Sequence, residues 1–364
     1  MSGRTSPGGA WSEGRVGAPP GSSGNRKRGS GPPPPPAPSA EPAIRTEGLS
    51  KRYGRRPIVR DLTFEVRPGE VYALVGPNGA GKTTVIRLVS GLAFPSEGTV
   101  RMLGRDPQQH PEVRRRLGAV VEAPAAFYPY LTGRANLRLH ARLAGGVPPG
   151  RIDELLELME LGHAADRKVG VYSLGMRQRL GVAGALLTDP DVLILDEPAS
   201  GMDPLSLHLV HRVLRDAASR GSAVLLSTHH LDEVATYGTR VGIMEEGELI
   251  DEVDLDRRRD RYRVRADDPQ AARQALAAQP WVQDAFLRAG QVIVQLAEPD
   301  ALGRVAPVLV EQGLVVHELT ADTFDLRAYY RERVAAERLR RTASGTTGTP
   351  PAVPPIGRDG SGPA

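Results

Sequence analysis

An apolar run, Val71–Val75, leads directly into a glycine-rich loop, and a helical pattern follows from Thr84 to Gly91. The loop has the G-x-x-x-x-G-K-[ST] spacing that binds phosphate when it lies between a strand and a helix. Its glycines let the backbone curl, so that N–H groups and the helix N-terminus face phosphate oxygens. Lys82 then places a positive charge at the β- and γ-phosphates, and the Thr83 hydroxyl can ligate Mg²⁺. The strand and the helix argue against a glycine-rich turn with a chance lysine. The expected nucleotide-binding residues here are Gly76, Pro77, Asn78, Gly79, Ala80, Gly81, Lys82, Thr83 and Thr84.

Two further apolar runs in residues 43–255 also end in polar side chains. Val192–Leu195 precedes two acids, and Ala223–Ser227 precedes a pair of histidines. Short apolar runs that alternate with helical patterns are typical of a parallel sheet covered by helices. Ligands of such sheets bind at the carboxyl ends of the strands. The sequence therefore predicts an α/β domain over 43–255, with these polar residues beside the phosphate loop.

The two acids, Asp196 and Glu197, are the residues that hydrolysis would need. Asp196 would hold Mg²⁺ through water, and Glu197 would orient and deprotonate the attacking water. Two acids at a strand end can instead cap the next turn, but a phosphate loop in the same domain favours catalysis. The interpretation is an ATPase that uses Mg²⁺.

The net charge of +4 suggests a nucleic-acid partner only until the charges are located. Residues 1–42 carry a net charge of +3 and residues 341–364 a net charge of +1, so the body between them is formally neutral. A neutral body lacks the basic surface of a nucleic-acid-binding domain, and no nucleic-acid partner is expected. The chain has no cysteine, which suits a reducing compartment. It shows neither a long apolar span nor a secretory leader, so we expect a cytosolic protein, or one that reaches a membrane only through a partner.

The two ends of the chain differ in composition from the body. Residues 1–42 are rich in Gly, Pro and Ser and contain five successive prolines, Pro32–Pro36. Such a segment buries too little apolar surface to offset the loss of chain entropy on folding. We expect disorder in 1–42 and again from about Thr342, and a helical end in 331–364 before that tail.

Residues 261–320 are predicted to form a separate α+β unit within an accessory domain that spans 256–330. The expected order is strand, helix, two strands of a hairpin, helix and strand, which is a ferredoxin-like βαββαβ pattern. The unit contains no convincing catalytic cluster. The expected elements are Tyr262–Arg265, Pro269–Ala278, Val282–Leu287, Gln291–Leu296, Pro299–Gln312 and Leu314–Leu319.

The stretch Tyr172–Leu180 makes a family resemblance specific. It resembles the signature sequence, beginning Leu-Ser-Gly-Gly-Gln, of the nucleotide-binding subunits of ATP-binding-cassette (ABC) transporters, and the resemblance covers about residues 43–250. Ser173 and Gly175 match that signature, whereas Tyr172, Leu174 and Met176 depart from it. A serine before a helical run is also an ordinary N-cap, and the two interpretations are compatible.

The resemblance implies an α/β fold: a RecA-like P-loop NTPase core, an N-terminal antiparallel β-subdomain and an α-helical signature subdomain. It also implies that Ser173, Leu174, Gly175 and Met176 contact the γ-phosphate held by an opposite subunit. A second ATP-binding subunit, by expectation an identical copy, would then complete each site.

Three further residues fall where the family places functional side chains. Tyr53 is expected to stack on adenine, although a surface tyrosine of a hairpin is the alternative. Asp203 matches a loop that communicates across the dimer, and it can equally be a turn residue before a proline. His229 matches the histidine that contacts the γ-phosphate and helps to position the catalytic water. A structural core histidine is the alternative there, and His230 is its neighbouring competitor. Glu197, His229 and Lys82 are thus the expected catalytic residues.

Glu122 stands where most of the family has a glutamine. An acid at this position, followed by the aromatic segment Phe127–Thr132, resembles the bacitracin and lantibiotic exporter branch. Glu122 could approach Mg²⁺ or its waters, so the expected metal residues are Thr83, Asp196 and Glu122; a solvent-facing loop acid is the alternative. In the family this loop receives the coupling helix of a polytopic permease, and exposed aromatic residues suit such an interface.

The resulting hypothesis is the ATP-hydrolysing subunit of an export system for an antibiotic, peptide or drug. It would lie at the cytoplasmic face of the cell membrane, held there by a separate permease. A soluble ATPase of the same superfamily in translation or DNA repair is one alternative. Such proteins usually carry two cassettes in one chain or a long coiled-coil insertion, and this sequence shows neither. A module that senses ATP without turnover is the other alternative, and the acids and histidine described above argue against it. The cargo and the role of the 256–330 domain stay open.

Overall fold

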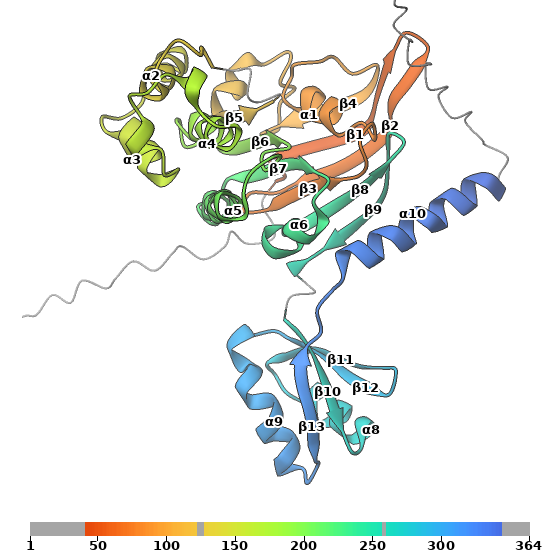
Figure 1. The fold of residues 1–364 in the computed structure, drawn as a ribbon. Coiled ribbons are helices and arrows are strands. Elements are labelled where there is room, and N and C mark those ends of the chain that lie inside the picture. Colours follow the sequence, from red (N-terminus) through yellow and green to blue (C-terminus); the bar gives the residue numbers. More distant parts are fainter. Residues whose placement is uncertain (1–40, 122–126, 257–259, 344–364) are drawn as a thin grey trace, which may run out of the picture. The chain divides into compact units, whose positions relative to one another are not determined.

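Residues 41–121, 127–256 and 260–343 are described by the computed structural model (Figure 1). Residues 41–256 form two sheets with their helices, and the residues from 260 onward form an α+β unit followed by a long helix. The tails that are expected to be disordered lie almost wholly outside the described residues, so that expectation stays a prediction. The α/β fold class expected from the sequence is confirmed.

Six strands form the central sheet in the order β5-β6-β7-β3-β8-β9. The neighbouring pairs run parallel except β8 and β9, which form an antiparallel hairpin at the edge. The middle strands are almost wholly buried, and their alternate residues enter two different apolar clusters, one on each face of the sheet. Burial on both faces explains the continuous apolar runs in the sequence. The strand bounds are β3 Val71–Val75, β5 Leu117–Val120, β6 Val192–Asp196, β7 Ala223–Thr228, β8 Arg240–Glu245 and β9 Glu248–Asp254.

Helices cover the two faces of this sheet. The apolar side of α1 packs into one cluster, together with Tyr72 and Leu74 of β3. The apolar sides of α5 and α6 pack into the other cluster, on the opposite face of the same strand. The bounds are α1 Lys82–Val89, α5 Pro204–Ser219 and α6 Leu231–Tyr237.

A second, antiparallel sheet has the strand order β2-β1-β4. Ile44, Leu62 and Met102 from its three strands are fully buried and join the cluster of α1. The sheet therefore covers the helix that begins at the phosphate loop, and it is the N-terminal β-subdomain expected from the sequence. The bounds are β1 Ile44–Tyr53, β2 Arg56–Val66 and β4 Glu97–Met102.

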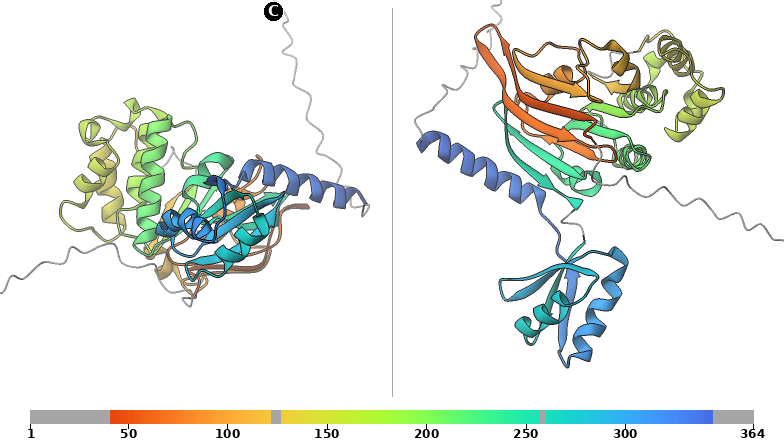
Figure 2. Two further views of the ribbon diagram at one scale, coloured as in Figure 1. Left: turned by 90° about the horizontal axis from the view of Figure 1, so that it is seen from below. Right: turned by 180° about the vertical axis from the view of Figure 1, so that it is seen from behind.

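Three helices, α2, α3 and α4, lie together beyond the edge strand β5 (Figure 2). Thr132 caps the N-terminus of α2, and Ser173 caps that of α4, because each hydroxyl accepts a hydrogen bond from a backbone N–H three residues later. Such a cap stabilises a helix by about 1 kcal/mol. The bounds are α2 Gly133–Leu143, α3 Arg151–Leu158 and α4 Leu174–Ala185, with short 3₁₀ turns at Pro111–Arg116, Gly162–Ala164 and Val169–Val171.

The C-terminal unit is an antiparallel sheet with the order β11-β12-β10-β13, which is the ferredoxin-like arrangement of a βαββαβ chain. One element differs from expectation. Pro299–Gln312 is not one helix but a 3₁₀ turn, Pro299–Ala301, followed by α9, Leu302–Glu311. The last strand also begins later than expected. The other bounds are β10 Arg261–Ala266, α8 Pro269–Ala277, β11 Val282–Arg288, β12 Gln291–Leu296 and β13 Val316–Ala321.

A final helix, α10 (Leu326–Ala343), follows β13 after the four residues 322–325. Its buried residues Leu326 and Val334 belong to the same apolar cluster as α5 and α6. The helix thus packs on the ATPase part of the chain. None of the helices among the described residues is long and apolar enough to cross a membrane.

Candidate nucleotide-binding and hydrolysis site

The phosphate loop lies between β3 and α1, as its spacing predicts. Pro77, Asn78 and Gly79 are exposed, whereas Gly76 and Ala80 are buried. Gly81 has φ of 100° and precedes the first helical residue without any side-chain cap. No acidic residue occupies the first turn of α1. The backbone N–H groups at this helix start are therefore available to an anion, and the helix dipole favours one.

Lys82 is 6% exposed, and its ammonium group is held inside the loop. Its Nζ donates to the carbonyl oxygen of Gly76 at 2.7 Å and to that of Pro77 at 3.3 Å. It also lies 3.5 Å from Oε1 of Glu197. The loop thus presents one buried positive charge beside its N–H groups, with a carboxylate at its side.

The loop packs directly on the backbone of another segment. A Cβ on Gly76 would overlap the carbonyl oxygen of Met244, the penultimate residue of β8. Gly247, in the turn after β8, donates its N–H to the carbonyl oxygen of Ala80 at 3.0 Å. These contacts leave no room for a side chain behind the loop, so the first glycine is required by close approach.

We expect Gly76→Ala to lower the free energy of unfolding by about 1–3 kcal/mol, because the clash is with backbone that cannot turn away. It should also weaken ATP binding, since relief of the clash displaces the loop. Thermal unfolding and fluorescent-ATP titration measure the two effects. Gly303→Ala, on α9 with open space around its Cβ, is the control: it should leave ATP binding unchanged and should not lower the free energy of unfolding, because alanine favours a helix more than glycine does. A Gly76→Ala protein with unchanged ATP affinity would contradict the packing argument.

Two oxygen groups meet where a magnesium ion would bind. The Thr83 hydroxyl at the start of α1 donates to Oδ1 of Asp196 at the end of β6, with 3.2 Å between the oxygens. Mg²⁺ is usually held by one or two protein oxygens together with substrate phosphates. Thr83 and Asp196 therefore fit the ion. Glu122, the third expected metal residue, lies outside the described residues.

Glu197 follows Asp196 with φ of 47°, a left-handed conformation that is uncommon for a residue other than glycine. Its backbone N–H donates to the carbonyl oxygen of Ser227 at 3.2 Å and to the hydroxyl of the same residue at 3.1 Å. A left-handed residue costs about 1–2 kcal/mol, so these contacts hold the carboxylate in a conformation that the chain alone would not choose.

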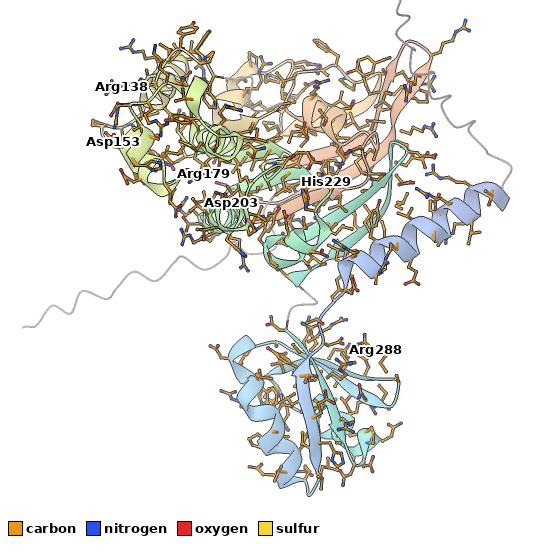
Figure 3. The ribbon with its side chains drawn as sticks, viewed as in Figure 1. Arg138, Asp153, Arg179, Asp203, His229 and Arg288 are labelled. Carbon is orange, nitrogen blue, oxygen red and sulfur yellow. The ribbon has the colours of Figure 1, made fainter. Side chains whose placement is uncertain are left out.

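His229 contacts the carboxylate of Glu197. Its Nδ1 lies 2.9 Å from Oε2 of Glu197, while the other carboxylate oxygen faces Lys82. The imidazole side chain is 44% exposed, which is unlike a structural core histidine. The ring of its neighbour His230 lies beside it, tilted by 37°, with 4.0 Å between ring centres. Figure 3 labels His229 near the middle of the ATPase part.

This arrangement can hold a triphosphate and activate water. A carboxylate beside a lysine and a histidine can accept a proton from water while the lysine faces the phosphates. The histidine can orient that carboxylate and contact the terminal phosphate. The structure therefore brings together five residues expected from the sequence: Lys82, Thr83, Asp196, Glu197 and His229.

The signature residues lie elsewhere. Ser173 caps α4, and its hydroxyl accepts from Met176 N–H at 3.2 Å. The space around Gly175 is open, since a Cβ added there would meet only the Met202 side chain, at 4.0 Å. Within the described ranges, no hydrogen bond or ion pair joins the segment Ser173–Met176 to the phosphate loop of the same chain. Their contact with a γ-phosphate stays a prediction.

Asp203 and Tyr53 keep both of their interpretations. Asp203 caps α5 by accepting from the N–H groups of Leu205 and Ser206, and the Ser206 hydroxyl bond lowers the pKa of its carboxyl below the ordinary value. The structural interpretation is thus realised, and a role across a dimer stays a prediction. Tyr53 ends β1, is 50% exposed and has the Lys51 ammonium 5.0 Å from its ring centre. A half-exposed ring at this position is accessible to adenine.

Ser227 is a site residue that sequence reasoning did not assign. Its hydroxyl donates to the carboxylate of Asp196 and accepts from the backbone N–H of Glu197, so one side chain holds both acidic residues. The only signal in the sequence is the position of a serine at the end of an otherwise apolar strand. Its pairing with Asp196 in parallel register required the order of β6 and β7.

Known proteins resemble the chain in both sequence and structure. The profile of the family described as ABC transporter matches residues 59–200. The bacitracin transport ATP-binding protein BcrA of Bacillus licheniformis is 35% identical over 293 residues, which are 79% of this chain and 95% of that protein. The Nod factor export ATP-binding protein I of Paraburkholderia xenovorans is 40% identical over 220 residues, 58% of this chain and 71% of that protein.

Two solved structures resemble more than half of the chain. An ATP-binding subunit of an ABC transporter has a TM-score of 0.55 at 32% identity and covers 59% of this chain and 90% of that chain. A bacterial ABC transporter cassette, solved as a dimer, has a TM-score of 0.53 at 25% identity and covers 58% of this chain and 98% of the cassette. Both likenesses support the fold described above.

Proposed function

This chain belongs to the family of ABC transporter ATP-binding proteins, and we propose that it powers an export system through a separate membrane permease. As a member of this family it hydrolyses ATP in support of transport. The observation that carries the catalytic assignment is the contact of Glu197 with His229, 2.9 Å apart beside Lys82. A phosphate loop alone supports only nucleotide binding.

In the proposed reaction, the loop N–H groups and Lys82 bind the phosphates and withdraw charge from the terminal one. Glu197 accepts the proton of the attacking water, and His229 holds the Glu197 carboxylate in place. Thr83 and Asp196 would hold Mg²⁺, which neutralises charge on the β- and γ-phosphates when bound. Ser227 keeps both acids at the strand ends where they act.

The proposed unit of function is a dimer. Support comes from the separation of Ser173 and Gly175 from the phosphate loop of their own chain, and from a relative solved as a dimer. In a head-to-tail dimer of two copies, the start of α4 in one copy would face the phosphates held by the other. Each ATP would then be enclosed by two chains, as a twofold interface requires.

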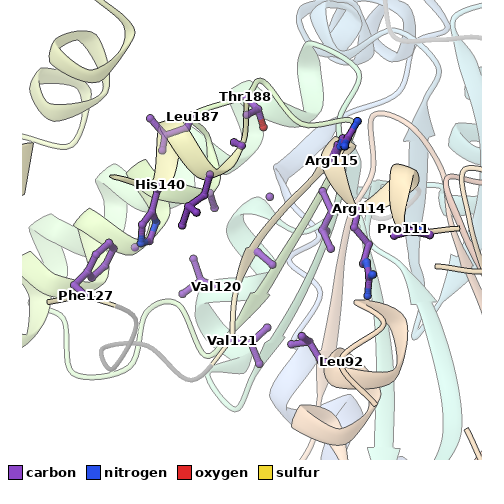
Figure 4. A pocket seen from close by; sticks show the side chains of 18 residues that line it. Leu92, Pro111, Arg114, Arg115, Val120, Val121, Phe127, His140, Leu187 and Thr188 are labelled. Atoms are coloured by element: carbon purple, nitrogen blue, oxygen red, sulfur yellow. The ribbon is translucent and has the colours of Figure 1, made fainter. Parts of the chain in front are cut away.

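An apolar pocket beside the helical subdomain is the proposed docking place of the permease (Figure 4). It has a volume of about 520 Å³ and is lined by β5 together with residues of α2 and α4. Phe127 stacks on His140 at its wall, and Leu143, which also lines it, is 80% exposed. Arg114 and Arg115 at its rim make no ion pair within the described residues. An apolar helix that carries an acidic residue would complement this surface.

The direction of transport and the cargo are proposed from relatives. One relative is a bacitracin transport protein and another serves Nod factor export. Together with the aromatic segment at Phe127–Thr132, this supports export of an antibiotic, a peptide or a drug. The proposed location is the cytoplasmic face of the cell membrane, reached through the permease.

If the permease docks at this pocket, a charged substitution in the pocket should weaken permease binding. We expect Leu143→Asp to reduce the permease that co-purifies with the chain by about tenfold, because a charge enters an apolar contact. ATP hydrolysis by the isolated chain should stay unchanged, because Leu143 ends α2 in the helical subdomain and is not one of the residues assigned to the ATP site. Val310→Asp, at a 61% exposed position of α9, is the matched control and should retain the permease.

Co-purification of a polytopic membrane protein with the tagged full-length chain tests the function itself. Capture of the permease by wild type and by Val310→Asp, but not by Leu143→Asp, is the expected pattern. Recovery of equal amounts of permease with Leu143→Asp would remove this pocket from the docking surface. Absence of any membrane partner from wild type would contradict the transport role.

A further inference from the structure

Three glutamates stand at the hairpin that joins β8 to β9, directly behind the phosphate loop: Glu245 ends β8, Glu246 follows it, and Glu248 begins β9. We call Glu245–Glu248 the acidic turn; it contains Glu245, Glu246, Gly247 and Glu248. Glu245 is 4% exposed, and its Oε2 has no hydrogen-bond partner within the described residues. A buried carboxylate of this kind is costly unless a positive charge lies close to it.

The acidic turn and the phosphate loop touch backbone to backbone. Gly247 donates its N–H to the carbonyl oxygen of Ala80, and its Cα lies 3.7 Å from the place of a Cβ on Gly81. Met244, just before the turn, closes the space behind Gly76. Because these contacts are made by backbone atoms with no side chain between them, a shift of the turn moves the loop. The negative charge of the turn also changes the electrostatic potential at the bound phosphates.

Arginines of α10 supply most of the positive charge beside the turn; Arg60 of β2 adds a longer contact, 3.4 Å from Glu248. Arg338 contacts Oε1 of Glu245 through two nitrogens, at 3.0 Å from Nε and 2.5 Å from Nη2. Arg341 lies 2.8 Å from Glu246 and 2.6 Å from Glu248. All three glutamates of the turn are therefore paired with one face of a single helix.

The same helix is anchored by apolar and polar contacts along its length. Leu326 and Val334 are buried in the core of the ATPase part. The Tyr329 hydroxyl donates to Asp251 of β9 at 2.6 Å, and Arg333 pairs with the same carboxylate at 2.7 Å. The ion pairs at the turn thus belong to a docked helix and not to a loose tail.

We propose that α10 is a support of the ATP site, with Arg338 and Arg341 as positioning residues that neutralise and hold the acidic turn behind the phosphate loop. ATP then binds with full affinity only while α10 is docked. The four residues 322–325 connect β13 to α10, so the C-terminal unit has a covalent route to ATP affinity. This inference rests on Gly76–Thr83 being the phosphate loop of the proposed function.

Electrostatics sets the direction of the effect. Loss of Arg338 leaves a buried carboxylate next to a site that must accept a triphosphate, so ATP binding weakens. The residues that accept the proton and orient the water are untouched, so the turnover number stays the same. If α10 served only to stabilise the fold, the loss of Arg338 would lower the stability of the protein but would not raise KM while leaving kcat unchanged.

Steady-state ATP hydrolysis by the full chain tests the proposal. We expect Arg338→Ala to raise KM for ATP about tenfold, with kcat within about twofold of wild type. Arg338→Lys keeps the charge but not both nitrogen contacts, so its KM should lie between those of wild type and Arg338→Ala. Arg338→Ala combined with Glu245→Gln removes both charges and should recover most of the lost affinity. Arg331→Ala, an exposed arginine of the same helix without an ion pair in the described part of the chain, is the matched control.

The result that overturns the proposal is a wild-type KM in Arg338→Ala. An equal loss of affinity in Arg338→Ala and in its combination with Glu245→Gln also overturns it, because helix packing alone would then be responsible. If Arg338→Ala does not fold, Arg341→Ala tests the proposal instead. Its partners Glu246 and Glu248 are more exposed than Glu245, so the expected effect on KM is smaller. A KM for ATP raised about threefold supports the proposal, and an unchanged KM refutes it. Failure of the proposed function looks different: wild type would then hydrolyse no ATP at all.

Discussion

Glu197→Gln is expected to slow ATP hydrolysis by about 10²–10⁴-fold while ATP still binds. The amide keeps the size of the side chain and can still contact His229, but it cannot accept a proton from water. It also removes the negative charge 3.5 Å from Lys82, which leaves the lysine free for the phosphates. Binding should therefore be equal to wild type or tighter, and only the chemical step should fail.

Phosphate release and fluorescent-ATP titration, made on the same preparation, separate these two effects. Glu311→Gln, at an exposed position that ends α9, is the control and should match wild type in both assays. Turnover near the wild-type rate in Glu197→Gln would remove Glu197 from the proton-accepting role. A loss of ATP binding instead of turnover would place this carboxylate in binding and not in hydrolysis.

Lys82→Ala is expected to abolish hydrolysis by weakening ATP binding about 100-fold or more. The lysine is the buried cation of the loop, and the methyl group of alanine carries no charge and makes no hydrogen bond. Its removal also leaves the carbonyl oxygens of Gly76 and Pro77 without their donor, so the loop loses part of its own order.

Titration with ATP and with uncharged adenosine distinguishes loss of the charge from loss of the fold. We expect the ATP affinity to fall while the thermal unfolding temperature changes by only a few degrees. Lys168→Ala removes an exposed lysine of the helical subdomain and serves as the control. ATP binding at wild-type strength in Lys82→Ala would contradict the assignment of the loop.

Sequence reasoning located the strands of the site because these strands are buried on both faces. Val71–Val75 is expected and observed with the same bounds, and the second run extends by one residue to include Asp196. A strand of this kind is a continuous apolar run, and the first polar residue after it marks the carboxyl end where ligands bind. The family resemblance then supplied the roles that the residue types alone leave open.

Contacts between distant segments could not be read from the sequence. The serine of β7 that fixes both acids is recognised only when the pairing of β6 with β7 is known. The antiparallel edge strand β9 and the backbone contact of Met244 with Gly76 depend in the same way on the sheet order. A helical end was expected from residue 331, but its start at Leu326 and its ion pairs with the acidic turn follow from tertiary packing.

The most direct test of the shared site is the mass in solution of Glu197→Gln, measured by light scattering with and without Mg-ATP. We predict the mass of one chain without nucleotide and of two chains with Mg-ATP, because each ATP is enclosed by the phosphate loop of one copy and the Ser173 segment of the other. Adding Ser173→Arg to the same variant should restore the mass of one chain. A single-chain mass for Glu197→Gln with ATP demonstrably bound would contradict a site shared between two subunits.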